Sequence, residues 1–388
     1  MKNQPIQNPV PEENESKLSF KLDIQAYTLI IALVLIALIF GFFTGGEFLS
    51  SRNISNLFSQ MAVIAVLAIG MTLLIVAGHI DLSVGSLVGL TGGVAAILQV
   101  WHGWNTFAVV VAAVAVGALF GVWQGWWVAY RAVPAFIVTL GGMLIFRGIL
   151  IGLSKGQTIS PMDESFKSIS NSYLPFSAGY ILAVGSILLL LFWTLKNRSK
   201  RRDLELLIPP AYIDYGKVAV YSFFILLAAY MLSRYQGVPI PVIIVVGLAA
   251  IYVFISNKTA FGRYVYAIGG NIEAAALSGI NIKRNTLMVF ISMGALSGVA
   301  GVLLTSRLNA ATVNAGNMYE LDAIAACVIG GTSLMGGRGK VVGALIGALI
   351  MASIDNGMSM MNIETFWQYI VKGLILIVAV WIDIASKK

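Results

Sequence analysis

Long apolar runs separated by short polar stretches dominate the chain. Each run holds about 17 to 25 residues, the length that an α-helix needs to cross a hydrocarbon core of roughly 30 Å. Backbone polar groups in lipid must find partners within their own segment, so helices are favoured, and short alternating strands of the barrel type are not seen in the sequence. The pattern predicts an all-α, polytopic transmembrane helical bundle of about ten to twelve membrane segments. We predict spans at 27–43, 57–77, 84–100, 106–130, 134–153, 179–195, 217–234, 240–256, 286–306, 321–335, 341–355 and 366–383.

Three of these spans are rich in glycine or too brief, namely 84–100, 321–335 and 341–355. Irregular helices survive at membrane depth only where protein surrounds them. We therefore expect one or more of the three to be re-entrant or broken.

Charge is scarce and lies on one side of the predicted spans. Hydrophobic residues make up 58% of the chain and charged residues 11%, whereas soluble domains carry roughly a quarter charged residues. Threading the spans from a cytoplasmic N-terminus places about 18 of the 25 Lys and Arg residues on the cytoplasmic side, as the positive-inside rule requires. This asymmetry explains the net charge of +8 without nucleic acid as a partner. We expect a multi-pass protein of the cytoplasmic (inner) membrane with both termini in the cytoplasm.

The N-terminal 26 residues carry Glu12, Glu13 and Glu15 among Pro and Asn. The apolar run that follows is longer than the central region of a cleaved signal peptide. We predict a cytoplasmic tail at 1–26, and then a single transmembrane domain at 27–385.

The sequence shows no motif for catalysis, metal binding or nucleotide binding. Cys327 is the only cysteine and the two histidines are too few for a metal site, so we expect no disulfide, no thiolate cluster and no bound metal. Residues 331–341 (GTSLMGGRGKV) invite comparison with a phosphate-binding loop. Leu334 stands where its first glycine belongs, and Val341 replaces the hydroxyl that would hold magnesium. The chain is therefore expected to have no catalytic residues and to draw its energy from another chain.

Glycines recur at four-residue spacing inside several spans. This spacing places them on one helix face, where another helix can approach closely. The interpretation that we favour for all of them is helix packing, led by Gly117, Gly121, Gly125, Gly343 and Gly347.

Isolated polar residues within or beside the spans are candidates for function. Asp81 and Ser83 stand where either side chain can cap a helix, and capping is favoured over direct contact with a transported molecule. Arg147 and Lys372 lie inside spans and need a carboxylate, a carbonyl or a water-filled cavity as partner, which the sequence leaves open.

Five motifs stand out along the chain: IDLSVGS (80–86), VPAFIVTLGGM (133–143), TAFGRYVYAIGGNIEAAALSGIN (259–281), AIAACVIGGTSLMGGRG (323–339) and DNGMSMM (355–361). Together they resemble the permease family of monosaccharide ABC importers, the ribose, arabinose, galactose and xylose type. The resemblance runs from about residue 57 to residue 385. Further motifs are GWWVAYRAVPAFIVTL (125–140), FRGILIG (146–152) and FWQYIVKG (366–373), and an extra segment at 196–256 carries a basic loop and two added spans. Through these the chain is most similar to the D-xylose branch of the family.

The resemblance implies a membrane permease that works with other chains. A periplasmic sugar-binding protein would deliver the sugar, two copies of the permease would form the pathway in the lipid, and a cytoplasmic ATPase would bind ATP and Mg, with no cofactor on this chain. The loop at 257–285 would couple to the ATPase through the short helix-forming run EAA and its glycine stop. The coupling residues implied are Asn271, Glu273, Ala274, Ala275 and Gly279.

A neutral sugar needs hydroxyl, amide and aromatic contacts more than charge. Candidates for the translocation pathway are therefore Asp81, Ser83, Thr332, Ser333 and Asn356. An alternative is a secondary sugar transporter driven by a proton or sodium gradient, which would need paired acidic and basic groups inside the spans. A membrane structural or receptor protein is disfavoured because no soluble domain longer than about 40 residues is present.

Overall fold

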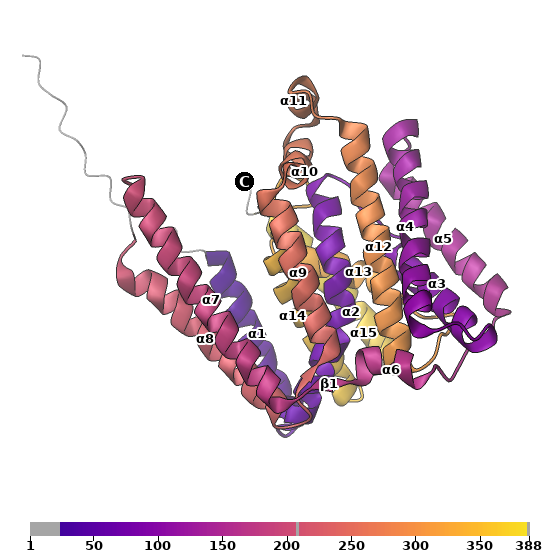
Figure 1. Cartoon of the computed structure of the whole chain (residues 1–388), viewed down its shortest axis with the longest axis horizontal. Coiled ribbons are helices and arrows are strands. Elements are labelled where there is room, and N and C mark those ends of the chain that lie inside the picture. Colours follow the sequence, from indigo (N-terminus) through magenta and orange to yellow (C-terminus); the bar gives the residue numbers. More distant parts are fainter. Residues whose placement is uncertain (1–23, 207–208, 386–388) are drawn as a thin grey trace, which may run out of the picture.

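The computed structural model describes residues 24–206 and 209–385, so the predicted tail at 1–26 lies almost wholly outside the described residues. Within them the predicted fold class is confirmed: the chain is a bundle of α-helices, ten of which are long and apolar enough to cross a membrane (Figure 1). The α-helices are α1 (Ile24–Phe43), α2 (Ser51–Val76), α3 (Val84–Ala96), α4 (Thr106–Arg131), α5 (Ala135–Ser154), α6 (Glu164–Asn171), α7 (Phe176–Asp203), α8 (Ala211–Ser233), α9 (Ile240–Lys258), α10 (Ala260–Gly270), α11 (Ile272–Leu277), α12 (Ile282–Leu308), α13 (Tyr319–Ile329), α14 (Val341–Met360) and α15 (Thr365–Ala385).

Short-range sequence signals explain where many of these helices begin. α5, α7, α8 and α9 each follow a proline, whose fixed φ and missing N–H suit a helix start. α2, α4 and α12 begin instead after Ser50, Asn105 and Asn281, whose side chains accept a hydrogen bond from a free backbone N–H of the first turn.

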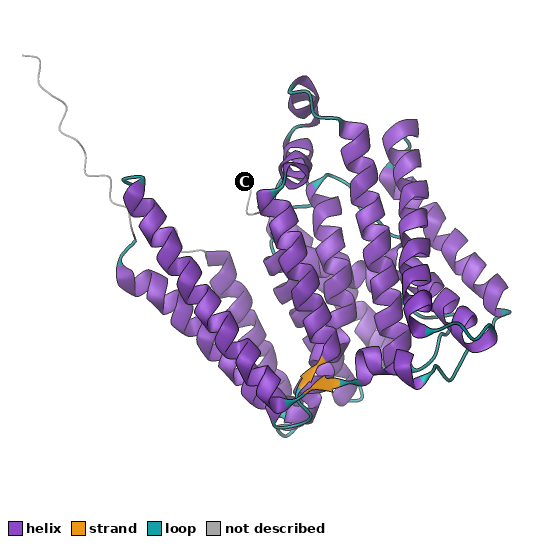
Figure 2. Cartoon of the chain, viewed as in Figure 1, coloured by secondary structure: helices purple, strands orange, loops and turns teal. Residues whose placement is uncertain are grey.

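The bundle has a buried centre and two distinct ends. α2 is buried along most of its length and packs against α9, α12, α13 and α14, whereas α15 has no buried residue. We call the end where α10 and α11 project beyond the C-terminus of α2 the α11 end, at the top of Figure 1. The opposite end, which we call the β1 end, carries strands β1 (Tyr173–Leu174) and β2 (Val238–Pro239), paired antiparallel and orange in Figure 2.

Glycine contacts bring α4 and α12 together. A Cβ on Gly117 would overlap the Gly294 carbonyl oxygen, and a Cβ on Gly121 would overlap that of Phe290. Gly125 faces Leu287 and Phe290 one turn further along. Without side chains the two backbones touch, and close packing of this kind drives helix association in lipid.

The span predicted at 321–335 is wrong in its extent. α13 ends at Ile329, and its 11 residues reach only about 16 Å, half of the hydrocarbon core. The chain turns at Gly331, whose φ of +85° suits glycine. α13 also begins inside the bundle, because Gly316, just before it, meets Gly85 in the first turn of α3. α13 is therefore the broken crossing expected among the three irregular spans.

The other two irregular spans are longer helices. α3 continues through a π-helical turn, Ile97–Trp101, so the combined segment is long enough to cross. α14 continues to Met360, five residues beyond the predicted limit at 355.

α7 and α8 form a long hairpin that lies beside α1 (Figure 1). In this view the three helices meet the rest of the bundle at the β1 end and lean away from it toward the α11 end. The segment predicted as extra, 196–256, contains the end of α7, all of α8 and most of α9.

Candidate functional site

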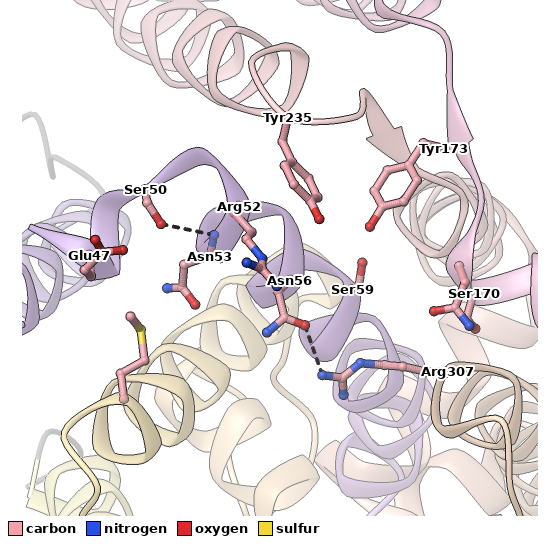
Figure 3. Close-up of a pocket in the computed structure, with 12 residues that line it drawn as sticks. Glu47, Ser50, Arg52, Asn53, Asn56, Ser59, Ser170, Tyr173, Tyr235 and Arg307 are labelled. Carbon is pink, nitrogen blue, oxygen red and sulfur yellow. Dashed lines mark hydrogen bonds between the residues drawn. The ribbon is translucent and has the colours of Figure 1, made fainter.

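A polar pocket of about 460 Å³ opens at the β1 end (Figure 3). Its volume lies within the range of ordinary small-molecule sites. The lining side chains come from several segments far apart in the sequence and are mostly amides, hydroxyls and phenols, with three charged groups. They are Glu47, Ser50, Arg52, Asn53, Asn56, Ser59, Ser170, Asn171, Tyr173, Tyr235, Arg307 and Met360.

The two tyrosines are placed by the short sheet. Tyr173 pairs with Pro239 across β1 and β2, and its ring lies edge-on to Tyr235 with centroids 6.2 Å apart. Gly237 permits the close approach of the strands, because a Cβ there would overlap the Leu174 carbonyl oxygen. Both phenol groups point toward the space beside Ser59 (Figure 3).

The opposite wall is formed by the start of α2 and the end of α12. Arg307 donates to the Asn56 amide oxygen at 3.3 Å, and Ser50 accepts from the Asn53 N–H. The Asn53 side chain donates in turn to Asn356 on α14 at 2.8 Å. Such a set of neutral donors and acceptors with few charges suits a polyhydroxylated neutral molecule.

A second polar cluster lies inside the bundle and ties three helices together. The ammonium of Lys372 on α15 lies 3.0 Å from Asp322 on α13 and 2.8 Å from Asp355 on α14. We call these residues the ion triad. One ammonium faces two carboxylates, so its formal charge is −1. The sequence left the partner of Lys372 open among three kinds of group, and the structure shows that it is a carboxylate pair.

Arg147 on α5 has carbonyl partners. Its guanidinium donates to the carbonyl oxygens of Val313 and Ala315, in the irregular segment that leads into α13. Carbonyls outside a helix need partners where no water is available. The guanidinium of Arg147 therefore supplies hydrogen-bond donors to the irregular segment before α13, the broken crossing.

Asp81 and Ser83 form a local turn ahead of α3. The Asp81 carboxylate accepts from the Ser83 N–H at 2.8 Å and from its hydroxyl at 2.6 Å, and both side chains are buried. Gln124 on α4 also donates to the Ser83 hydroxyl. The hydrogen bonds seen for these two residues thus hold the entry to α3.

At the α11 end, α10 joins two parts of the bundle. A Cβ on Gly269 would overlap the Val76 carbonyl oxygen at the end of α2, and that oxygen accepts from the Gly337 N–H at 2.9 Å. Tyr266 donates to the Gly339 carbonyl oxygen at 2.7 Å. Burial raises the pKa of the Tyr266 phenol, so this donor stays protonated. We call this set of contacts the α10 joint.

Beyond the joint stands α11, which carries the predicted coupling residues. Asn271 caps it by accepting from the Ala274 N–H, Glu273 lies in its first turn, and Gly279 follows it with φ +80°. Leu277 is 90% exposed. Ile272 of the same helix is 53% exposed, so this six-residue helix presents two apolar side chains, which is the character of a contact surface.

The predicted pathway residues lie in three separate places. Asp81 and Ser83 are before α3, Thr332 and Ser333 are in the turn at the α11 end, and Asn356 is near the β1 end. The structure therefore brings only neighbouring pairs together. The sequence did not predict the residues that line the polar pocket, because they come from several distant segments. Only Asn356, which accepts a hydrogen bond from the lining residue Asn53, was among the predicted residues.

Comparison with known proteins gives one family for nearly the whole chain. The family model described as "Branched-chain amino acid transport system / permease component" matches residues 53–201 and 208–380. No solved structure matches the chain with significance.

Individual relatives cover almost the full length. The Xylose transport system permease protein XylH of Escherichia coli K12 is 51% identical over 367 residues, 95% of this chain and 93% of that protein. XylH of Haemophilus influenzae is 50% identical over 372 residues, 95% of this chain and 99% of that protein. The Ribose import permease protein RbsC of E. coli K12 is 37% identical over 358 residues, 92% of each chain. The chain thus belongs to this family of membrane transport permeases.

Proposed function

We propose that the chain is the membrane-spanning subunit of an ATP-driven importer and that it carries a monosaccharide, D-xylose. The named function of XylH relatives at 50–51% identity over nearly full length supports the sugar. A gradient-driven transporter would need paired acidic and basic groups inside the spans, and the ion triad is such a pairing. The choice of the importer therefore rests on the named function of the relatives.

The coupling role is supported mainly by the exposure of α11, which directly follows α10 and its contacts in the α10 joint. A partner that binds Leu277 and moves α11 would also move α10, because the two helices are consecutive. Gly269 and Tyr266 would pass that motion to the end of α2 and to the turn between α13 and α14. The partner is a cytoplasmic ATPase with its ATP and Mg, and this chain needs no cofactor of its own.

The motion reaches the interior through the broken crossing. α13 follows the irregular segment held by Arg147, and its own Asp322 is held by Lys372. A half-length helix with a turn at each end can tilt as a unit, as the hinged elements of alternating-access proteins do. Tilting of α13 against α3 would open and close the route between the two ends of the bundle.

The polar pocket is the entrance for the sugar. Its amides, hydroxyls and phenols match the hydroxyl groups of a monosaccharide, and it lies at the end opposite α11. A periplasmic binding protein would release the sugar there. Two copies of the permease would complete the pathway, as the family resemblance implies.

The orientation follows from the basic residues. Lys196, Arg201, Lys258 and Arg284 lie at the α11 end, and cytoplasmic loops carry such residues. The α11 end therefore faces the cytoplasm, the polar pocket faces the periplasm, and both termini are cytoplasmic.

A test of the coupling role uses two matched exposed leucines. Leu277→Asp on α11 should lower ATP-dependent D-xylose uptake by about tenfold or more. A contact residue at the centre of an interface contributes much of the binding affinity between the two proteins. Leu204→Asp, 58% exposed at the end of α7, makes the same change on the same side of the membrane and should leave uptake within about twofold. Uptake is measured in vesicles that contain the ATPase and the binding protein, with copurification of the ATPase as a second readout. Equal uptake by both variants would contradict the coupling role of α11.

A further inference from the structure

An apolar crevice of about 420 Å³ separates the core from α1 and α8. Ile30 and Leu38 of α1 face Phe224 and Met231 of α8 across it, and Leu349 of α14 lies at its back. Nearly all its lining is aliphatic or aromatic. A crevice like this inside a membrane is filled by something apolar.

A smaller basic pocket of about 200 Å³ lies between α7 and α8, nearer the α11 end. Three cationic side chains, Arg198, Arg201 and Lys217, line it together with one carboxylate, Asp214. Arg198 forms an ion pair with Asp214 and also donates to a backbone carbonyl. The lining thus has a formal excess of two positive charges, and this excess favours an anion.

The two spaces share one residue. Tyr221 lines both the basic pocket and the apolar crevice. Along α8, Lys217, Tyr221, Phe224, Ala228 and Met231 recur at spacings of three and four residues, which places them in one stripe. The stripe passes from a cation through an interfacial aromatic to apolar side chains, which is the polarity profile of one lipid leaflet.

We propose that the α7–α8 hairpin and α1 hold an anionic phospholipid. Its phosphate lies in the basic pocket against Arg201 and Lys217, and an acyl chain lies in the crevice. The stripe from Tyr221 to Met231 is about 15 Å long, close to half of the roughly 30 Å hydrocarbon core and thus to one leaflet.

Charge and position together select a lipid over other occupants. A free phosphate would use only the basic pocket and leave the crevice without a ligand. A second copy of the chain would have to place apolar side chains in the crevice and anionic ones beside Lys217. The surrounding segment 196–205 has five basic and two acidic residues, Asp203 and Glu205, so the local charge also favours an anion from the adjoining leaflet.

The test measures binding of phosphatidylglycerol and of phosphatidylcholine with the same acyl chains to the full-length protein in detergent, by native mass spectrometry. Arg201→Gln with Lys217→Gln should weaken phosphatidylglycerol binding roughly 30-fold, because each cation near a membrane surface contributes about a fivefold step. Lys200→Gln with Arg202→Gln removes the same charge from side chains that do not line the pocket, and should weaken binding at most about threefold.

A second pair of variants tests the crevice. Ala228→Trp fills it and should abolish the preferential retention of phosphatidylglycerol, whereas Leu226→Trp, on an exposed position outside the lining, should leave retention unchanged. The proposal is overturned if both charge pairs lose affinity equally, since binding would then be diffuse attraction. It is also overturned if inorganic phosphate displaces the lipid, or if Ala228→Trp changes the oligomeric state while lipid binding persists.

Discussion

Removing the ammonium of the ion triad should destabilise the protein strongly. Lys372 is 13% exposed, and its nitrogen contacts two carboxylates, one of them on Asp322 with 1% exposure. Asp322 and Asp355 each also have a second carboxylate oxygen that is buried without a hydrogen-bond partner among the described residues. Lys372→Met keeps the length of the side chain and leaves two buried charges without their cation.

The size of the effect follows from burial. Breaking a buried pair by removing one partner costs about 3–5 kcal/mol of unfolding free energy, because the remaining charge is uncompensated. The matched substitution Lys167→Met removes an exposed pair with Glu164, in which the side chains are 37% and 87% exposed, and screening limits such a pair to about 0–1 kcal/mol. Converting the triad as a whole with Lys372→Met, Asp322→Asn and Asp355→Asn should recover most of the loss, since no unpaired charge remains.

The assay is unfolding of the purified protein in mixed micelles as the denaturing detergent is increased, followed by helical circular dichroism. The expected order of unfolding free energy is wild type and Lys167→Met highest, the triple variant next and Lys372→Met lowest. If Lys372→Met unfolded together with Lys167→Met, the ion triad would not hold α13 to α14 and α15.

Three further outcomes are expected. Gly269→Ala should lower ATP-dependent uptake at least about tenfold while ATPase binding is retained, because the new Cβ would overlap the end of α2. The control Gly270→Ala places its Cβ in open space and should leave uptake unchanged in the same assay. Gly121→Leu should cost about 1–3 kcal/mol or more of unfolding free energy through overpacking against α12, and Gly148→Leu, with open space around it, should cost less than 1 kcal/mol. Tyr235→Ala should raise the KM for D-xylose uptake roughly tenfold through lost pocket contacts, and an unchanged KM would count against the polar pocket as the entrance.

Hydropathy alone predicted the fold because the membrane imposes a simple rule. Each of the twelve predicted spans corresponds to a helix, since a helix satisfies its own backbone hydrogen bonds in lipid. The predicted end of the span at 321–335 lies beyond the end of α13 at Ile329. Further apolar and small residues follow Ile329, so the hydropathy stays high although the backbone turns at Gly331. Glycine is compatible both with a tightly packed helix and with a turn, and composition does not separate the two.

The candidate site was less accessible to prediction, for reasons that are geometric. The charge of Lys372 signalled that a partner was needed, but Asp322 lies 50 positions away within an apolar stretch. The polar pocket depends on Tyr173 and Tyr235 being brought together by two strands of only two residues each. Strands that short leave no periodic pattern in the sequence. The coupling residues remain a prediction, and they could be proposed from the sequence because they form one contiguous motif that folds as α11.

The central claim is that this chain moves sugar only when an ATPase drives it. The direct measurement is uptake of labelled D-xylose into vesicles that hold the purified chain, with and without the ATPase, the binding protein and ATP, and with an imposed proton or sodium gradient. We predict uptake only when all three additions are present, and none from a gradient alone. Gradient-driven uptake by the chain by itself would contradict the account.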